Sequence, residues 1–191
     1  MDKLVIRALS PDLIEDYLGF FDRDAFADNP EWASCYCYFY HAPHKLKAWE
    51  ARTREENRAA MSELISSGRM HGYLAYIEGQ PMAWCHAAPR IQIPNLQEKD
   101  ELRVDDVERI GAIVCFIVAK PYRRQGIARR LLDAACEGFH ELGLVYAEAY
   151  PRINVSDDAA NYHGPLKMYL KAGFKPFREF RDFMMVRKLL E

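Results

Sequence analysis

The stretch from residue 112 to residue 142 constrains the fold more than any other part of the chain. It holds eight consecutive apolar residues (112–119), then a basic turn that ends at Gly126, then apolar residues at helical spacing. A continuous apolar run rich in β-branched residues predicts a strand that is buried on both faces. The apolar stripe after the turn predicts a helix packed on the same sheet. Together with the apolar segment 144–150, the stretch predicts a parallel strand–helix–strand unit.

The turn at residues 120–126 has the composition of an anion-binding site. Gly126 lets the backbone approach a ligand closely, at a helix start where N–H groups lack partners. Arg123, Arg124 and Arg129 add positive charge beside those groups. The turn has neither the Gly-Lys-Ser/Thr ending of a Walker loop nor the glycine spacing of a dinucleotide-binding loop. One interpretation is therefore a pyrophosphate held mainly by backbone amides, and the other is a solvated basic turn.

The rest of the chain predicts further strands, helices and loops around this unit. Strands are expected at residues 4–9, 73–77, 82–86, 144–150 and, as a pair, within 174–190. Helices are expected at residues 10–21, 46–66 and 164–171. Long loops are expected at residues 89–108 and 151–161. The sequence shows no repeat and no linker, so we expect a single domain over residues 1–191.

Composition argues against several classes of protein. The formal net charge of −2 argues against a general nucleic-acid binder. No apolar run approaches the roughly 20 residues of a membrane span, and the N-terminus lacks the apolar core of a secretory signal. The five cysteines include no Cys-x-x-Cys pair, which argues against a disulfide framework. We therefore expect a cytoplasmic, reduced protein that binds neither nucleic acid nor membrane.

Two motifs resemble those of the GNAT superfamily of N-acetyltransferases. Residues 118–128 read Val-Ala-Lys-Pro-Tyr-Arg-Arg-Gln-Gly-Ile-Ala and resemble the family's acetyl-CoA motif, Arg-x-x-Gly-x-Ala after a strand end. Residues 166–174 read Leu-Lys-Met-Tyr-Leu-Lys-Ala-Gly-Phe and resemble its later motif, Tyr-x-x-x-Gly-Phe. The resemblance implies an α+β, three-layer GNAT-like fold whose motif-bearing core spans about residues 70–190. In that fold a mixed, mostly antiparallel, splayed sheet is flanked by helices and carries the parallel strand–helix–strand unit at the coenzyme A site.

The resemblance also implies acetyl-CoA as the co-substrate. The amides of residues 124–129 would hold its pyrophosphate, and the strand before the turn would present backbone groups to the pantetheine arm. The implied cofactor-binding residues are Phe116, Ile117, Val118, Arg123, Arg124, Gln125, Gly126, Ile127, Ala128 and Arg129. The family often places Asn seven residues before the motif tyrosine, where this chain has Tyr162, with Asn161 one step earlier. The sequence therefore leaves open an asparagine contact to the cofactor.

Acetyl transfer to an amine needs a proton acceptor for the amine and a proton donor for the departing thiolate. The resemblance implies Tyr169 as the donor, and the alternative role of this residue is a core aromatic. Glu108, just before the central strand, is the candidate base, with His86 as a rival. Their alternative roles are a solvated surface charge for Glu108 and a hydrogen-bonded sheet residue for His86.

The expected function is N-acetyl transfer from acetyl-CoA to a primary amine of a small molecule, or of a protein or peptide. The amine would attack the thioester directly in a ternary complex. The alternative is a non-catalytic, coenzyme-A-binding sensory module. The sequence leaves open whether two subunits form a homodimer.

Two segments are candidates for the acceptor pocket. The loop at residues 98–108 carries an excess of acidic residues, which either favours a cationic amine or forms a solvated face. The second segment either lines a small-molecule pocket or alternates along a half-buried strand. Its aromatic residues are Trp32, Tyr36, Tyr38 and Tyr40.

A thiol and imidazole grouping near the second segment raises the question of a metal site. Its residues are Cys35, Cys37, His41 and His44. These donor types suit zinc, but Cys-x-Cys followed closely by two histidines is not a usual zinc spacing. We therefore expect no metal.

Overall fold

The computed structural model describes residues 4–42, 46–155 and 160–190. Within these residues the strands form a seven-stranded sheet in the order β1-β2-β3-β4-β5-β7-β6. The strands are β1 (Val5–Ala8), β2 (Tyr73–Ile77), β3 (Gln80–Pro89), β4 (Ile110–Val118), β5 (Tyr146–Ala149), β6 (Lys175–Glu179) and β7 (Met184–Leu189). β4 and β5 are parallel, whereas the other neighbouring pairs are antiparallel. The predicted mixed, mostly antiparallel sheet with one parallel unit is confirmed.

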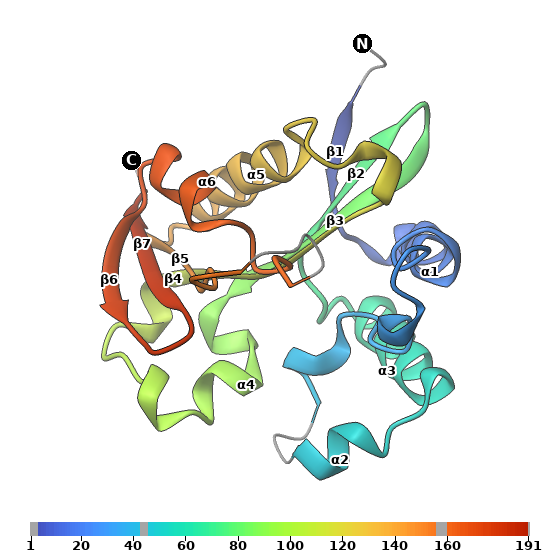
Figure 1. Ribbon diagram of the computed structural model, residues 1–191, viewed down its shortest axis with the longest axis horizontal. Coiled ribbons are helices and arrows are strands. Elements are labelled where there is room, and N and C mark those ends of the chain that lie inside the picture. The colour runs from blue at the N-terminus through green and yellow to red at the C-terminus, as the bar shows by residue number, and fades with distance from the viewer. Residues whose placement is uncertain (1–3, 43–45, 156–159, 191) are drawn as a thin grey trace.

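Helices cover both faces of this sheet (Figure 1). The helices are α1 (Ile14–Arg23), α2 (Leu46–Glu50), α3 (Arg54–Ser66), α4 (Pro94–Gln97), α5 (Ile127–Glu141) and α6 (Leu166–Lys171). α5 and α6 lie on one face, and α1, α3 and α4 lie on the other, which gives three layers (Figure 1). Each face has its own apolar core. Phe139 and Tyr169 are buried on the α5 side, and Tyr17, Met61 and Trp84 are buried on the α1 side.

Helix α5 lies close to the centre of the sheet because its apolar stripe faces β4. Leu131, Leu132 and Phe139 of this stripe are buried. The ring of Phe139 lies over Gly111 of β4, where a Cβ atom would stand 2.3 Å from the ring. Only glycine permits this approach, so Gly111 determines how closely α5 packs on the strand that leads into the basic turn.

Strand β4 parts from β5 halfway along its length. β5 pairs with β4 only from Ile110 to Ile113, although β4 continues to Val118. On the other side, the pairing of β4 with β3 skips Val114, which forms a β-bulge. Val114 and the next residue, Cys115, both face the α1 side of the sheet. The sheet is therefore splayed at the carboxyl end of β4, as the resemblance implied.

The predicted helix at residues 46–66 is two helices. The side chain of Thr53 accepts the backbone N–H of Glu56 at 3.2 Å, and the Glu56 carboxylate accepts the backbone N–H of Thr53 at 2.8 Å. This capping box starts α3 at Arg54. The Thr-x-x-Glu pattern is visible in the sequence and marks the break.

Two other segments also differ from expectation. The predicted loop at residues 89–108 contains α4 and short 3₁₀ turns, with Pro94 in the first turn of α4, where a missing N–H costs nothing. The segment at residues 35–40 ends in a 3₁₀ turn, Tyr38–Tyr40, so its interpretation as a half-buried strand is wrong.

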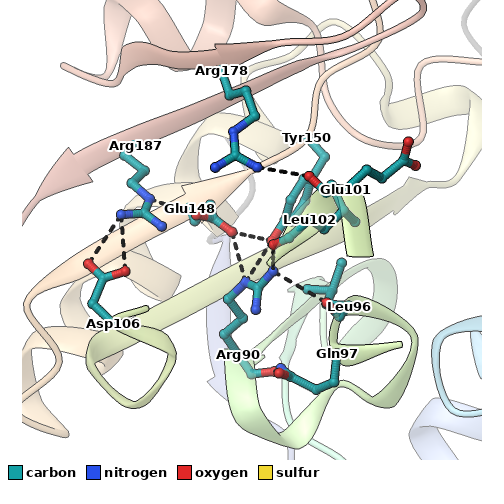
Figure 2. Close-up of polar contacts among 10 residues, drawn as sticks. All are labelled: Arg90, Leu96, Gln97, Glu101, Leu102, Asp106, Glu148, Tyr150, Arg178 and Arg187. Atoms are coloured by element: carbon teal, nitrogen blue, oxygen red, sulfur yellow. Dashed lines mark hydrogen bonds and ion pairs between the residues drawn. The ribbon is translucent and has the colours of Figure 1, made fainter. Parts of the chain in front are cut away.

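A buried ion network holds residues 90–109 against the sheet (Figure 2). Nε of Arg90 lies 3.0 Å from Oε1 of Glu148, and the two side chains are 1% and 0% exposed. Arg187 of β7 donates to the second carboxylate oxygen of Glu148 at 2.6 Å and to Asp106 at 3.2 Å. Two guanidinium groups thus compensate two carboxylates, which a buried charge requires. The network fixes the acidic loop to β5 and β7.

Candidate active site

The turn between β4 and α5 presents backbone N–H groups at the start of a helix. Gly126 is the N-cap of α5 with a φ of 82°, in the left-handed region that glycine adopts without strain. No side chain in the described part of the chain caps α5. The N–H groups of Ile127, Ala128 and Arg129 have no partner within the helix. Together with the helix dipole, these groups favour an anion at this position.

Two arginines beside the turn are paired with carboxylates. Arg123 forms two hydrogen bonds to Asp28, at 2.7 and 2.8 Å. These bonds hold the pKa of Asp28 below its usual range. Arg129 pairs with Asp133, one turn along α5, at 2.9 Å. Arg123 and Arg129 are therefore engaged in ion pairs that brace the turn.

A cavity of about 470 Å³ opens beside the turn and follows the end of β4. The predicted cofactor-binding residues that line it are Phe116, Ile117, Val118, Arg123, Arg124, Gly126, Ile127, Ala128 and Arg129. Gln125 is the exception, because its side chain donates to the carbonyl oxygen of Pro121 at 2.9 Å. Asn161, Tyr162 and Met168 also line this cavity. The strand and the turn thus meet at one cavity, which we call the donor cavity.

The part of β4 that β5 leaves unpaired is covered by the segment before α6. The backbone N–H of Phe116 donates to the carbonyl oxygen of Tyr162. Nδ1 of His163 lies 2.8 Å from the carbonyl oxygen of Val114, which also accepts the hydroxyl of Tyr40 at 2.9 Å. Residues 162 and 163 therefore bridge the splayed strands beside the donor cavity.

Tyr169 lies in the core behind Phe116 and is not itself among the residues that line the donor cavity. It is fully buried, and its ring centroid is 6.4 Å from that of Phe116 and 5.2 Å from that of Phe174. Its hydroxyl donates to the carbonyl oxygen of His163 at 2.7 Å. Burial raises the pKa of Tyr169 well above its usual value, so the hydroxyl keeps its proton at neutral pH.

The two candidate bases are not among the residues that line the donor cavity. Glu108 is exposed and precedes Phe116 by eight residues of mostly extended chain, a span of roughly 26 Å. His86 is fully buried in β3, with Nδ1 3.5 Å from Sγ of Cys37 and Nε2 3.4 Å from Nε2 of His41. Burial lowers the pKa of His86 well below its usual value.

A second cavity, of about 290 Å³, adjoins the donor cavity. The residues that line both are Phe26, Trp32, Ile117 and Tyr162. The residues that line the second cavity alone are Glu31, Ser34, Cys35, Cys37, Phe39, Tyr40, Trp49 and Cys115. Its wall consists mainly of aromatic rings and thiols, with one carboxyl group from Glu31. Because aromatic faces attract cations, this wall suits an ammonium group.

The predicted aromatic segment forms part of this second cavity. Trp32 and Tyr40 line it, whereas Tyr36 and Tyr38 do not. The other aromatic lining residues, which the sequence did not identify, are Phe26, Phe39, Trp49 and Tyr162. None of residues 98–108 lines either cavity, so the structure separates the acidic loop from both.

Neither a metal-ligating cluster nor a membrane-spanning helix occurs in residues 4–42, 46–155 and 160–190. No group of three or more His, Cys, Asp or Glu side chains in these ranges is arranged to hold a metal ion. Of the predicted grouping, Cys35, Cys37 and His41 are described, and His44 lies outside the described residues. In the same ranges, every helix is too short or too polar to cross a membrane.

The chain matches one protein-family model over most of its length. The model is that of the Acetyltransferase (GNAT) family, and it matches residues 26–174. No curated protein matches the sequence.

Solved structures share the fold at low sequence identity. An acetyltransferase of the GNAT family from Streptococcus pneumoniae is 18% identical with a TM-score of 0.57, and the match covers 99% of this chain and 100% of that one. PaiA N-acetyltransferase from Thermoplasma acidophilum, in complex with coenzyme A, is 14% identical with a TM-score of 0.59, covering 98% and 99%. The ribosomal-protein-S18-alanine N-acetyltransferase from Escherichia coli is 13% identical with a TM-score of 0.54, covering 98% and 94%.

Proposed function

Since this chain belongs to the GNAT family of acetyltransferases, we propose that it transfers the acetyl group of acetyl-CoA to a primary amine of a small molecule. The observation that carries this proposal is the junction of two cavities at Ile117 and Tyr162. The donor cavity adjoins an anion-binding turn, and the second cavity, which we call the acceptor cavity, is lined by aromatic rings. Substrates held in adjoining cavities would form the ternary complex that direct attack requires.

The donor cavity has groups that fit two parts of acetyl-CoA. The N–H groups of Ile127, Ala128 and Arg129 would hold the pyrophosphate, as a helix N-terminus holds anions. The backbone of Phe116 and Val118 would pair with the pantetheine arm in the manner of an added strand. The coenzyme A in the structure of PaiA N-acetyltransferase supports the same donor here.

Tyr169 is the proposed proton donor. Acetyl-CoA supplies an activated thioester, whose C–S bond breaks as the amine nitrogen bonds to the acetyl carbon. The thiolate then needs a proton, and the hydroxyl of Tyr169 carries one at neutral pH. The ring of Tyr169 lies next to Phe116, at the part of β4 that lines the donor cavity.

The acceptor cavity favours a compact amine over a protein chain. Its volume of about 290 Å³ is at the lower end of small-molecule sites. Rings such as Trp49 and Tyr40 would surround an ammonium group, and the carboxylate of Glu31 would add attraction at an exposed position. We infer an amine with a small apolar or aromatic body.

A thiol-release assay with acetyl-CoA tests this proposal. The panel comprises 2-phenylethylamine, tyramine, spermidine, kanamycin and a peptide with a free N-terminus, with mass spectrometry of the products. We expect release with the two compact aromatic amines and little with the peptide. Binding of coenzyme A without thiol release for any amine would contradict the enzyme and favour the non-catalytic alternative.

A pair of variants separates the acceptor cavity from general damage. Trp49→Ala removes a ring that lines only the acceptor cavity, and we expect a higher KM for the amine with an unchanged Kd for coenzyme A. Phe177→Ala removes a half-exposed ring on β6 and serves as the control, with unchanged constants. Equal KM values in both variants would place the amine elsewhere.

A further inference from the structure

Three side chains connect the acceptor cavity with a separate groove. Cys37 lines the acceptor cavity, and its Sγ lies 3.5 Å from Nδ1 of His86. The Nε2 atoms of His86 and His41 are 3.4 Å apart, with ring planes that differ by 15°. His41 in turn lines a groove of about 500 Å³ together with Arg69 and His71. A continuous series of polar contacts therefore runs from the cavity to the groove.

A strained turn holds Cys37 at the start of this series. Tyr36 and Cys37 both have positive φ angles, 46° and 57°, a conformation that is strained for a non-glycine residue. Two hydrogen bonds fix the turn: the Tyr17 hydroxyl donates to the carbonyl oxygen of Tyr36 at 2.8 Å, and the Tyr36 hydroxyl donates to Asp22 at 2.5 Å. Strain that is fixed by such contacts is often found where a side chain must occupy a functional position.

Both imidazoles are neutral at pH 7. Burial lowers the pKa of His86 well below its usual value, and the neighbouring His41 and His71 lower it further. Burial lowers the pKa of His41 to about 4, with smaller contributions from His71 and Arg69. The other titratable groups that face the pair are Cys37, Tyr40 and Tyr38. The thiols of Cys35, Cys85 and Cys115 interact with that of Cys37. A neutral imidazole offers one N–H and one lone pair, so each ring can take a proton on one nitrogen and release one from the other.

Building on the acetyl transfer proposed above, we propose that Cys37, His86 and His41 form the path by which the acceptor amine loses its proton to the groove. A primary ammonium group has a pKa of about 10 and enters the cavity protonated. Its nitrogen cannot attack the thioester until one N–H proton leaves and the lone pair is free.

The proton transfer balances along the three side chains. An ammonium proton moves to Sγ of Cys37 as the thiol proton moves to Nδ1 of His86. The Nε2 proton of His86 moves to Nε2 of His41, and the Nδ1 proton of His41 leaves to water in the groove. One proton enters the path and one leaves it, no charge stays on the three side chains, and the electron pair stays on the amine nitrogen.

The pH dependence of turnover tests this path. The variants are Cys37→Ala, Cys37→Ser, His86→Gln and His41→Gln, with His140→Gln on the exposed face of α5 as the control. kcat/KM is measured at saturating acetyl-CoA with 2-phenylethylamine, or with the best-accepted amine of the panel, from about pH 6 to about pH 10. The Kd for coenzyme A and the thermal midpoint of each variant accompany the rates.

We expect Cys37→Ala, His86→Gln and His41→Gln to lower kcat/KM at pH 7 by about tenfold to a hundredfold. The deficit should close as the pH approaches the pKa of the free amine, because the amine then arrives without its extra proton. Cys37→Ser keeps a hydroxyl that can pass a proton and should restore most of the rate at pH 7. The control and the Kd for coenzyme A should not change.

Two results would overturn the path. Superimposable pH profiles in the wild type and in the folded variants would show that the proton leaves directly to Glu31 or to water. A deficit of equal size at every pH would show a structural role only. If His86→Gln does not fold, His41→Gln, at the partly exposed end, still decides the question. Absence of thiol release by the wild type would contradict the proposed function itself, which is a different outcome.

Discussion

The backbone N–H of Phe116 donates to the carbonyl oxygen of Tyr162 at 2.5 Å. This bond pairs β4 with the segment before α6, beyond the point where β4 and β5 separate. The edge proposed to receive the pantetheine arm is therefore already satisfied by the protein's own backbone. A pantetheine arm that pairs with Phe116 must therefore replace Tyr162 as the hydrogen-bond partner of Phe116.

Binding of coenzyme A should therefore release the segment of residues 160–166. Hydrogen exchange of its amides should become faster when coenzyme A is added, while exchange at the first turn of α5 should become slower. The amide of Phe116 should stay protected, because one acceptor replaces another. Slower exchange, or no change, in residues 160–166 at saturating coenzyme A would contradict the exchange of partners.

Gly126 should matter for binding coenzyme A in a way that Gly143 does not. The two glycines flank α5 with φ angles of 82° and 74°, and a Cβ atom meets open space at both positions. Alanine should therefore cost each site a similar amount, about 1 kcal/mol of stability. Gly126→Ala should weaken binding of coenzyme A at least about tenfold, because the strained turn re-aims its amides. Calorimetry that shows equal affinities of both variants for coenzyme A would show that the turn does not bind it.

Tyr169→Phe should lower kcat while leaving the affinity for coenzyme A nearly unchanged. The variant keeps the buried ring and removes only the hydroxyl, so the expected loss is about a hundredfold or more. Tyr76→Phe is the matched control. It removes a hydroxyl of β2 that donates a hydrogen bond to Asp16 at 2.7 Å. Undiminished turnover in Tyr169→Phe would show that the Tyr169 hydroxyl is not the proton donor.

Glu148, which forms buried ion pairs, should contribute far more to stability than Glu63, which forms an exposed ion pair. Glu148→Gln leaves the guanidinium groups of Arg90 and Arg187 without a buried counter-charge, and should lower the free energy of unfolding by about 3 kcal/mol or more. Glu63→Gln breaks an exposed ion pair with Arg69 and should change the free energy of unfolding by less than about 1 kcal/mol. Urea unfolding measures both. Similar losses would show that the network in Figure 2 adds no more than a surface pair.

Acid should destabilise the protein through its buried histidines. Burial lowers the pKa of His41 and His163 from 6.5 to about 4. The unfolded chain therefore binds these protons first, so the stabilisation is complete above pH 6.5 and is lost as the pH falls to about 4. Each histidine adds a slope of up to about 1.4 kcal/mol per pH unit.

Urea unfolding across this pH window checks the histidine contribution. His163→Gln should show a shallower dependence than the wild type, and the exposed His140→Gln should match the wild type. A slope for His163→Gln as steep as that of the wild type would assign the acid sensitivity to other groups.

The sequence predicts the strand, turn and helix beside the donor cavity because these elements are contiguous in the chain. The apolar strand, Gly126 and the amphipathic helix follow one another within residues 112–142, and local rules cover each of them. The capping box at Thr53 was equally local, and it marks a break that the apolar pattern alone does not show. These features need no knowledge of distant contacts.

The acceptor side could not be predicted in this way. Its lining combines residues from the segment after α1, from α2, from β4 and from the segment before α6. Cys37 and His86 are 49 positions apart, and Arg90 and Glu148 are 58 apart. No local period or motif relates such pairs, because only the sheet order brings them together. A buried ion pair also resembles two solvated charges in the sequence.

The β-bulge at Val114 shows that one additional residue in a strand, whatever its side chain, can bend the strand and open the sheet. Val114 and Cys115 face the same side, so a chain shorter by one residue here would leave Ile113 and Phe116 on the faces that they now occupy. It would lack the bend that the extra residue introduces. Residues 112–119 of the sequence are all apolar, so no change of side-chain chemistry along β4 marks the bulge. Deleting one residue here would therefore straighten β4 beside the donor cavity while every residue of both motifs stayed in place.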